Sequence, residues 1–153
     1  MEKLEGKFAE SVELGSGRVV NRDLFLFLLD LEVKRSRRYQ NFLCLMFFNI
    51  QPFSKNGNGG GLQNCYDTLT KILLEEMRES DIIGTLELNK LVVLLPYADA
   101  KAGAYVQSRF EDVMKYYDFK SKGFEIKIHQ VCFPVHGTDT MDLIRKALEA
   151  ETT

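Results

Sequence analysis

The chain has 153 residues, 45% of them hydrophobic and 27% charged, which is the composition of one globular domain rather than of a disordered or fibrous protein. Its net charge of −2 excludes a sequence-independent nucleic-acid binder, because such a protein needs a broad basic face. No segment approaches the roughly 20 apolar residues of a membrane span, and no apolar signal-peptide core follows the charged N-terminus. We therefore expect a cytoplasmic domain without a membrane span.

The first part of the chain predicts an incoming segment and a helix. Residues 1–20 show weak periodicity and are interpreted as an incoming N-terminal segment, so the predicted single domain is residues 21–150. Asn21 is a favourable N-cap residue, and apolar side chains at helical spacing after it predict the first helix. The basic run at 34–38 is typical of a helix C-terminus, where positive charge complements the helix dipole.

A strand and a loop are predicted next. Residues 42–50 form a continuous apolar run that is too short for an ordinary buried helix, so they predict a central strand. Residues 55–61 are rich in Gly and Asn and predict a flexible loop. A phosphate-binding P-loop is not expected there, because no Lys-Ser or Lys-Thr pair follows the glycines.

The rest of the chain predicts alternating helices and strands. Apolar residues around 69–77 recur at helical spacing, and the apolar runs 82–86 and 91–95 flank the polar pair Asn89-Lys90 as in a β-hairpin. A further helix, a strand and a closing helix are predicted at residues 99–116, 125–133 and 139–150. This order predicts an α/β protein, an α+β sandwich in which a layer of helices covers one sheet with a ferredoxin-like βαββαβ core.

The cysteines and histidines predict no metal or redox site. Cys44, Cys65 and Cys132 are odd in number and widely spaced, without a CxxC pair, so we expect buried, reduced thiols. His129 and His136 are the only histidines, and they are expected to be structural or exposed.

Three landmarks carry a resemblance to a known family. Residues 81–96 begin with an Asp, place Glu-Leu-Asn-Lys-Leu at 87–91 between two apolar runs, and end in Pro. Asn21-Arg22 opens the first helix, and Phe-Asn-Ile-Gln-Pro-Phe at 48–53 closes the first long strand. In spacing and element order this resembles the GGDEF domains of diguanylate cyclases, over roughly residues 18–148. The resemblance implies a core of the GGDEF/nucleotide-cyclase type with an N-terminal helix.

The residues at the family's catalytic positions imply a degenerate domain. In active members, carboxylates at the strand end and in the signature hold magnesium, which bridges the GTP phosphates. Those positions here are Asn49 and Asn89, and Lys90 replaces the next acidic residue. Glu87 and Leu88 replace the two glycines that let the nucleotide approach the backbone. The resemblance therefore implies that this chain is not an enzyme, with no metal and no cofactor.

A second site of the family is matched. Many cyclases bind their product, cyclic di-GMP, at an inhibitory Arg-x-x-Asp five residues before the signature and at an Arg on the helix after the Pro-ended strand. Arg78, Asp81 and Arg109 match that pattern. A guanidinium can bind guanine O6 and N7 or a phosphate, and a carboxylate can accept from guanine N–H groups. Spacing alone favours a surface ion pair between Arg78 and Asp81 near a helix end, and the family register together with Arg109 favours the ligand site.

Three functions remain open from the sequence. The first is a cyclic di-GMP receptor in bacterial second-messenger signalling, with ligand-binding residues Arg78, Asp81 and Arg109. The second is a nucleotide-free interaction or dimerisation module, whose partner is a second copy or another signalling protein and whose candidate surface holds the aromatic residues Tyr116, Tyr117 and Phe119. The third is an enzyme that retains some nucleotide chemistry with altered residues.

Overall fold

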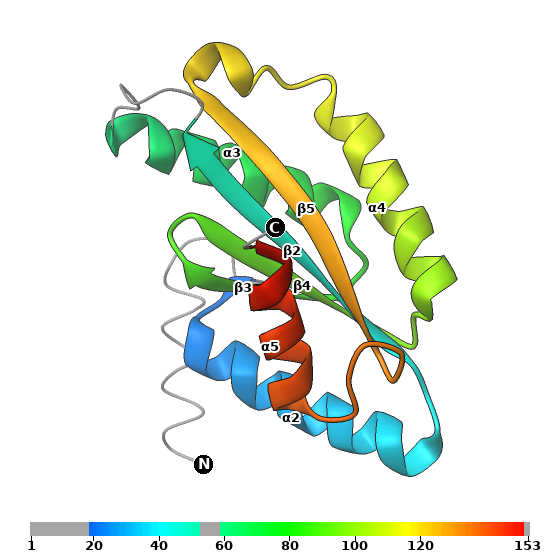
Figure 1. Cartoon of the computed structure of the whole chain (residues 1–153). Helices are drawn as coiled ribbons and strands as arrows, with labels where there is room; N and C mark the ends of the chain where they lie inside the picture. Colours follow the sequence, from blue (N-terminus) through cyan, green and yellow to red (C-terminus); the bar gives the residue numbers. More distant parts are fainter. Residues whose placement is uncertain (1–18, 53–58, 152–153) are drawn as a thin grey trace.

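The computed structural model describes residues 19–52 and 59–151 (Figure 1). The strands are β1 (Val19–Val20), β2 (Leu43–Pro52), β3 (Ile82–Glu87), β4 (Lys90–Pro96) and β5 (Phe124–Phe133). The helices are α2 (Arg22–Tyr39), α3 (Gly59–Glu76), α4 (Ala100–Met114) and α5 (Thr140–Glu151), with a short 3-10 turn, η1 (Lys120–Lys122), before β5. All the predicted helices and strands are therefore present. Asn21 is the N-cap of α2, and its side chain accepts a hydrogen bond of 2.9 Å from Leu24 N–H, as predicted.

The five strands form one sheet in the order β1-β3-β4-β2-β5. The four long strands pair antiparallel, and β1 joins the β3 edge in parallel. Elements β2-α3-β3-β4-α4-β5 form the βαββαβ unit, so the predicted ferredoxin-like core is confirmed. Strand β1 lies within the segment that the sequence assigned to residues 1–20, whose other residues, 1–18, are outside the described part of the chain.

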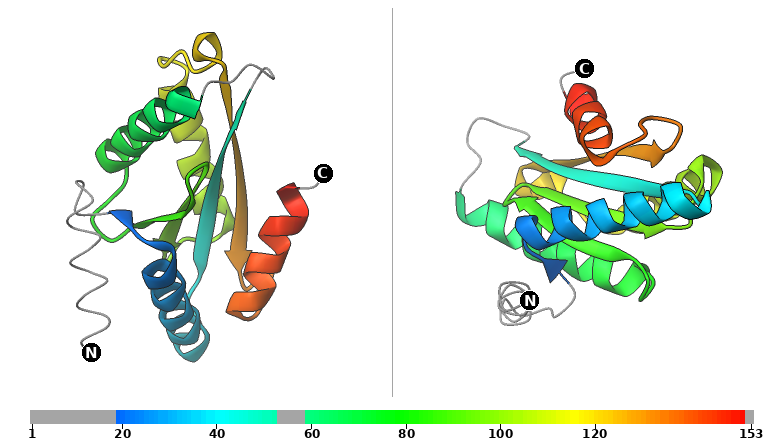
Figure 2. Two further views of the ribbon diagram at one scale, coloured as in Figure 1. Left: turned by 90° about the vertical axis from the view of Figure 1, so that its left-hand side faces the viewer. Right: turned by 90° about the horizontal axis from the view of Figure 1, so that it is seen from below.

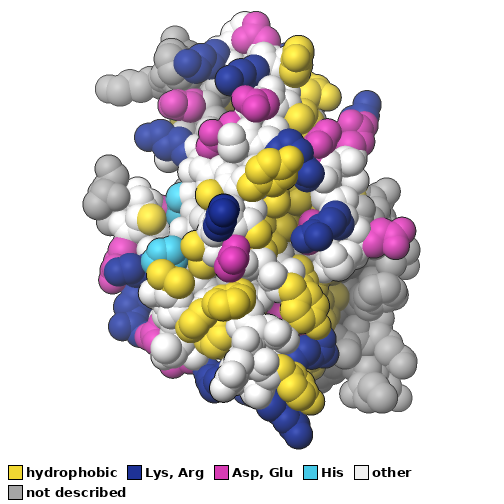
Figure 3. All heavy atoms as spheres, turned by 90° about the vertical axis from the view of Figure 1, so that its right-hand side faces the viewer, with side chains coloured by type: hydrophobic (Ala, Val, Ile, Leu, Met, Phe, Trp, Pro, Cys, Tyr) yellow, Lys and Arg dark blue, Asp and Glu magenta, His cyan; other side chains and the backbone are white. Residues whose placement is uncertain are grey.

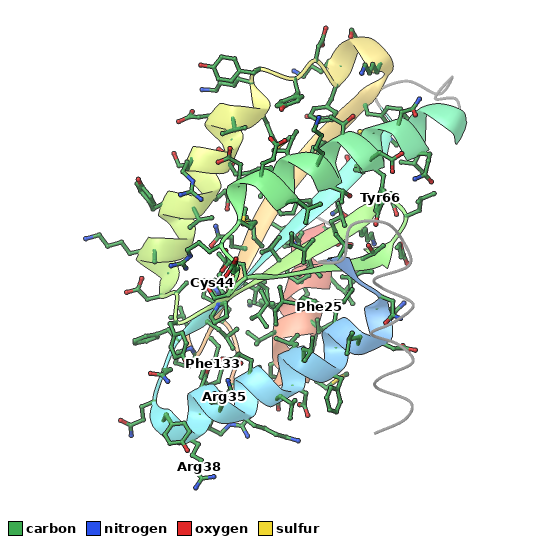
Figure 4. The ribbon with its side chains drawn as sticks, turned by 180° about the vertical axis from the view of Figure 1, so that it is seen from behind. Phe25, Arg35, Arg38, Cys44, Tyr66 and Phe133 are labelled. Carbon is green, nitrogen blue, oxygen red and sulfur yellow. A yellow bond between two sulfur atoms is a disulfide. The ribbon has the colours of Figure 1, made fainter. Side chains whose placement is uncertain are left out.

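Helices cover both faces of the sheet, whereas the sequence predicted one layer of helices (Figure 2). Residues of α3 and α4 pack on one face with Cys44, Met46 and Phe48 of β2, and residues of α2 and α5 pack on the other with Leu45 and Phe47. Because successive side chains of a strand point to opposite faces, β2 is apolar on both, which explains its continuous hydrophobic run. On the α2 side, Phe25 points from the helix to the sheet (Figure 4).

Two local predictions are corrected. Helix α3 begins at Gly59, so the last glycines of the predicted loop belong to a helix, while residues 55–58 lie outside the described residues. A Cβ at Gly61 would lie 3.0 Å from the Phe124 ring, so the close approach of this helix to β5 favours glycine. The β3–β4 turn falls on Leu88-Asn89 rather than on Asn89-Lys90, and Lys90 begins β4.

The cysteine prediction is wrong for two of the three residues. The register of β2 and β5 places Cys44 opposite Cys132, with a Cα–Cα distance of 4.1 Å, and the two form a disulfide. The Cys44 Sγ atom also lies close to the start of α4, 3.4 Å and 3.3 Å from the carbonyl oxygens of Ala98 and Asp99. Cys65 is a buried free thiol, and burial raises its pKa to about 11.

Candidate functional site

Strand β3 joins two candidate sites. The signature hairpin is residues 87–91, at the end of β3, and it is held against β2 by a hydrogen bond of 2.8 Å from Ile50 N–H to Asn89 O. The α3–β3 corner is residues 77–81, at the start of β3, together with Arg109 of α4. The seven residues from Asp81 to Glu87 are separated by six strand steps, which span about 20 Å in an extended strand. The two sites therefore lie at opposite ends of β3.

The signature hairpin is closed by ion pairs. Lys90 Nζ lies 3.0 Å from Glu151 Oε2 on α5 and 3.7 Å from Glu87 Oε2 across the turn. The hydrogen bond to Glu151, followed by the charges of both glutamates, raises the pKa of Lys90. Its ammonium group is therefore held in the charged state by neighbours from the same chain. Leu88 stands at the tip of the turn, half exposed.

The residues at this hairpin do not suit a magnesium ion. Asn49 is buried and directly opposite Lys90 in the β2–β4 ladder, so the cross-strand neighbour of its amide is a cation. Magnesium prefers charged oxygen ligands, and an ammonium group beside the site would repel it. Among the described residues, no group of three or more His, Cys, Asp or Glu side chains is placed to hold a metal ion.

At the corner, Asp81 closes the turn between α3 and β3. Its Oδ2 accepts a hydrogen bond of 2.9 Å from Arg78 N–H, and its own N–H donates to Arg78 O at 3.0 Å. The Asp81 side chain is only 3% exposed, whereas that of Arg78 is 66% exposed. The distance of 3.9 Å from Arg78 Nη2 to Asp81 Oδ1 fits the ion pair that the sequence left open. The carboxylate thus has a structural role, and the guanidinium faces solvent.

Arg109 joins the corner from α4. Its Nη2 donates a hydrogen bond of 3.1 Å to Glu76 O, the carbonyl of the last residue of α3. Helix ends leave such carbonyls without a partner inside the helix, so an arginine is favourable there. The structure therefore brings Arg78, Asp81 and Arg109 together around one helix end, with two exposed guanidinium groups.

A cavity of about 450 Å³ beside β1 and α3 is absent from the sequence predictions. It is lined by Asn21 and Arg22 at the start of α2, by Asp67 and Lys71 of α3, and by Tyr66, among others. The Tyr66 hydroxyl is 2.6 Å from Thr85 Oγ1 of β3, which ties α3 to the sheet at this place (Figure 4). These residues come from separate elements, so no local motif could have indicated the cavity.

Of the three aromatic residues expected on the surface, two are exposed and one is buried. Tyr116 is 90% exposed and Tyr117 is 38% exposed, whereas Phe119 is buried in the core formed with α3 and α4, so the expected exposure of Phe119 is wrong. No helix among the described residues has both the length and the apolar character needed to cross a membrane.

Solved structures of similar fold include several GGDEF domains. A DGC protein from Thermotoga maritima aligns with a TM-score of 0.74 at 18% identity, covering 87% of this chain and 95% of that one. The active GGEEF domain of a diguanylate cyclase from Vibrio cholerae aligns with a TM-score of 0.69 at 12% identity, covering 85% and 86%. The coiled coil and GGDEF domain of DgcB from Caulobacter crescentus, solved with c-di-GMP, aligns with a TM-score of 0.68 at 12% identity, covering 97% and 85%. At these identities the likeness shows the fold alone.

The sequence itself gives the family. No curated protein matches the chain significantly in sequence. The family profile described as "Diguanylate cyclase, GGDEF domain" matches residues 17–152, which include every strand and helix described above. The chain therefore belongs to the GGDEF domain family.

Proposed function

We propose that this chain is a catalytically silent GGDEF domain that binds cyclic di-GMP at the α3–β3 corner. The observation that carries the proposal is a contrast in charge between the two sites. At the signature hairpin the Lys90 ammonium is 27% exposed and paired with Glu151 and Glu87. At the corner the Arg78 guanidinium, 3.9 Å from Asp81, is 66% exposed, and Arg109 is exposed as well. An anionic dinucleotide would therefore bind at the corner.

The loss of turnover follows from the residues of the signature hairpin. Phosphoryl transfer requires a metal that neutralises charge on the phosphates, and Asn49 with Lys90 opposite offers it no charged ligand. Leu88 and Glu87 carry side chains where the family's glycines leave room for the nucleotide. Both changes block the same phosphoryl-transfer step. Restoring the metal ligands alone would therefore leave the side chains of Glu87 and Leu88 in the way of the nucleotide.

Binding at the corner follows from guanidinium chemistry. An arginine can make two parallel hydrogen bonds to a phosphate or to guanine O6 and N7, and this geometry is not available to lysine. Arg78 and Arg109 approach the end of α3 from different elements, so they can hold a ligand from two sides. In DgcB from Caulobacter crescentus, a GGDEF domain of this fold was solved with cyclic di-GMP.

Asp81 can act in ligand binding either by positioning Arg78 or by contacting guanine directly, and a substitution of Asp81 distinguishes the two roles. As the turn stands, the buried carboxylate positions Arg78 through its backbone N–H. Contact with guanine N–H groups requires the Arg78 guanidinium to move off the carboxylate first. Asp81→Asn keeps the size and one oxygen but adds a donor facing guanine donors, so a direct contact predicts weaker binding at unchanged stability of the fold.

Two assays test this function. Purified protein incubated with GTP and magnesium should form no cyclic di-GMP detectable by chromatography, and the double variant Asn49→Asp, Asn89→Glu should remain silent because Glu87 and Leu88 are still present. Protein-dependent product from the unmodified chain would overturn the catalytic half. For the binding half, cyclic di-GMP should give a saturable calorimetric titration that Arg109→Ala weakens. Absence of heat and saturation at about 100 μM ligand would overturn that half.

A nucleotide-free interaction module remains the second candidate function. The observation that favours it is the exposure of aromatic side chains near the end of α4, at Tyr116 and Tyr117. Isolated exposed aromatics are ordinary on protein surfaces, so this observation alone identifies no partner. Equal titration heats for buffer and cyclic di-GMP, with a stable assembly in the absence of nucleotide, would favour this function over the first.

A further inference from the structure

The outer edge of β5 is open along its middle. β5 is the last strand in the sheet order, so only its inner edge pairs, with β2. In antiparallel strands, residues whose backbone groups face the neighbour alternate with residues whose groups face away. Cys132 N–H donates to His136 Nδ1 and Cys132 O accepts from His136 N–H, both at 2.8 Å, and Phe124 N–H donates to Phe119 O at 3.0 Å. The even-numbered residues of β5 therefore direct their backbone groups outward.

Between these two capped ends lie three outward-facing residues, Ile126, Ile128 and Gln130. Their outward N–H and C=O groups have no hydrogen-bond partner within the part of the chain that the structure describes. Such a row of backbone groups is a template for another strand. The chain thus closes both ends of this edge itself and leaves the centre available.

A groove lined by both apolar and charged residues, among them Glu111, Lys115 and Asp118, runs along one face of this edge. It has a volume of about 500 Å³ and lies between β5, the end of α4 and the segment that leads into η1. From β5 its walls include Phe124, Ile126 and Ile128, and Tyr117 also lines it. Figure 3, which views the molecule from the side of α4 and β5, shows hydrophobic side chains gathered in a band between charged groups.

The other face of the edge carries charges of opposite sign. Glu125 and Lys127 alternate with the isoleucines along β5 and therefore share the opposite face. Lys127 is exposed and Glu125 is half-buried, and neither forms an ion pair with another described residue. The edge thus combines a row of apolar β5 side chains on one face with a short sequence of opposite charges on the other.

We propose that a second copy of this chain pairs with this edge, β5 to β5 and antiparallel, about a two-fold axis at Ile126. In this register Ile126 lies opposite the partner's Ile126, and Phe124 lies opposite the partner's Ile128. On the other face Glu125 lies opposite the partner's Lys127, and symmetry repeats that pair. Apolar pairs on one face and opposite charges on the other are the cross-strand neighbours that stabilise a sheet. The self-complementary pattern is what a two-fold interface requires.

Neighbouring registers are less favourable. An axis at Glu125 places two glutamates opposite each other, and an axis at Lys127 does the same with two lysines. An axis at Ile128 places Lys127 opposite the partner's His129 and Ile126 opposite the partner's Gln130. Like charges directly opposite destabilise a sheet, and a polar side chain opposite an isoleucine loses the apolar pair. The charges of β5 therefore select the register centred on Ile126.

The backbone groups of this edge complete the pairing. Ile126 N–H donates to the carbonyl of the partner's Ile126, and Ile128 N–H donates to the carbonyl of the partner's Phe124, with the same bonds repeated by symmetry. Phe124 N–H is not needed, because it already donates to Phe119 O. The two sheets then form one continuous sheet with both α4 helices on the same face.

This interface goes beyond the proposed nucleotide function and does not depend on it. Arg78 and Asp81 precede β3, and β3 is separated from β5 by β4 and β2. Substitutions on β5 therefore leave the α3–β3 corner unchanged. Failure of the dimer would say nothing against cyclic di-GMP binding, and failure of ligand binding would say nothing against the dimer.

Light scattering coupled to gel filtration tests the proposal on the full chain in nucleotide-free buffer. At about 100 μM protein, the mass should be twice the 17.6 kDa of one chain. Glu125→Lys and Lys127→Glu should each weaken the dimer by about tenfold or more, because each places like charges opposite each other twice. The double variant Glu125→Lys, Lys127→Glu restores opposite charges in the same register, so it should restore the dimer.

A matched control separates register from net charge. Lys146→Glu makes the same charge change on the exposed side of α5 and should leave the mass unchanged. Circular dichroism should show all four variants folded. A monomer at every concentration tested would overturn the proposal, as would a dimer that neither single reversal weakens or that the double variant fails to restore. The last two results would place the contact elsewhere or assign the edge to a different protein.

Discussion

The signature hairpin and the α3–β3 corner lie at the two ends of β3, and their charged side chains differ in how far they are exposed to solvent. At the hairpin, Lys90 is 27% exposed and its charge is balanced by Glu151, which is 17% exposed. At the corner, Asp81 is 3% exposed and carries the local turn, while the Arg78 guanidinium lies mostly in solvent. The hairpin charge lies within internal ion pairs, whereas the Arg78 charge is mostly exposed beside the buried Asp81 carboxylate.

Substitutions at the two ends of β3 should therefore have different effects. Changes at the hairpin should alter stability and leave cyclic di-GMP binding intact. At the corner, stability and binding should separate between residues, because the buried carboxylate supports the turn and the exposed guanidinium contacts the ligand.

The largest effect is expected on ligand affinity. Arg78→Ala should weaken cyclic di-GMP binding by about 10- to 150-fold, or about 1.5–3 kcal/mol, because a charge-assisted contact is lost. Arg78→Lys should recover little, since an ammonium group cannot make the paired hydrogen bonds of a guanidinium. Lys90→Ala is the matched control at the hairpin, and it should leave the affinity unchanged. Equal losses at both ends of β3 would remove the distinction between the two sites.

A smaller effect is expected on stability at the corner. Asp81→Ala should lower the free energy of unfolding by about 1–2 kcal/mol, because Arg78 N–H would lose its buried acceptor. Arg78→Ala should cost less than about 1 kcal/mol, since its ion pair is mostly exposed. Urea titrations of both variants measure the difference. A larger stability loss for Arg78→Ala than for Asp81→Ala would contradict this division of roles.

At the hairpin, Lys90→Met should lower the free energy of unfolding by about 1 kcal/mol at neutral pH, because Glu151 loses its partner. The pKa of Lys90 is raised in the folded state, so its contribution is complete below the ordinary lysine value of 10.5 and disappears as pH rises through the folded-state value. Unfolding titrations of wild type and Lys90→Met should therefore converge at strongly alkaline pH. A constant gap between them would exclude the ion pair as the cause.

The smallest effect concerns His129, which stacks on Phe47 with ring centroids 5.0 Å apart. Burial lowers its pKa below the ordinary 6.5, so the unfolded chain takes up a proton first as pH falls. Stability should therefore decrease below about pH 6.5, and His129→Phe should reduce that slope while keeping the stacked ring. Denaturation midpoints at about pH 5 and about pH 8 give the comparison. Identical slopes in both proteins would refute the assignment.

The sequence predicted the elements better than the contacts between them. The hairpin and the strand before it were visible as apolar runs, and family spacing grouped Arg109 with Arg78 and Asp81, whereas its contact with the end of α3 was not predicted. The layer of α2 and α5 on the second face was not predicted, because the pattern of one helix does not say which sheet face it covers. Burial on both faces does explain the unbroken apolar run of β2.

Pairs that are distant in sequence could not be predicted. Cys44 and Cys132 are 88 residues apart, and Lys90 and Glu151 are 61 apart, so each pair exists only because of strand order and helix placement. The burial of Asp81 was also invisible, since the same Arg-x-x-Asp spacing fits an exposed ion pair. Local patterns thus indicated which residues to consider, and the fold decided which of them touch.

Calorimetric titration of cyclic di-GMP into wild type and Arg78→Ala tests whether the α3–β3 corner is a ligand site. We expect saturable binding by the wild type, a loss of about 10- to 150-fold in affinity in Arg78→Ala, and a free energy of unfolding that is unchanged within about 1 kcal/mol. Wild-type affinity in Arg78→Ala, or no binding by the wild type at about 100 μM ligand, would contradict this expectation and leave Arg78 and Asp81 as an ion pair that closes a turn.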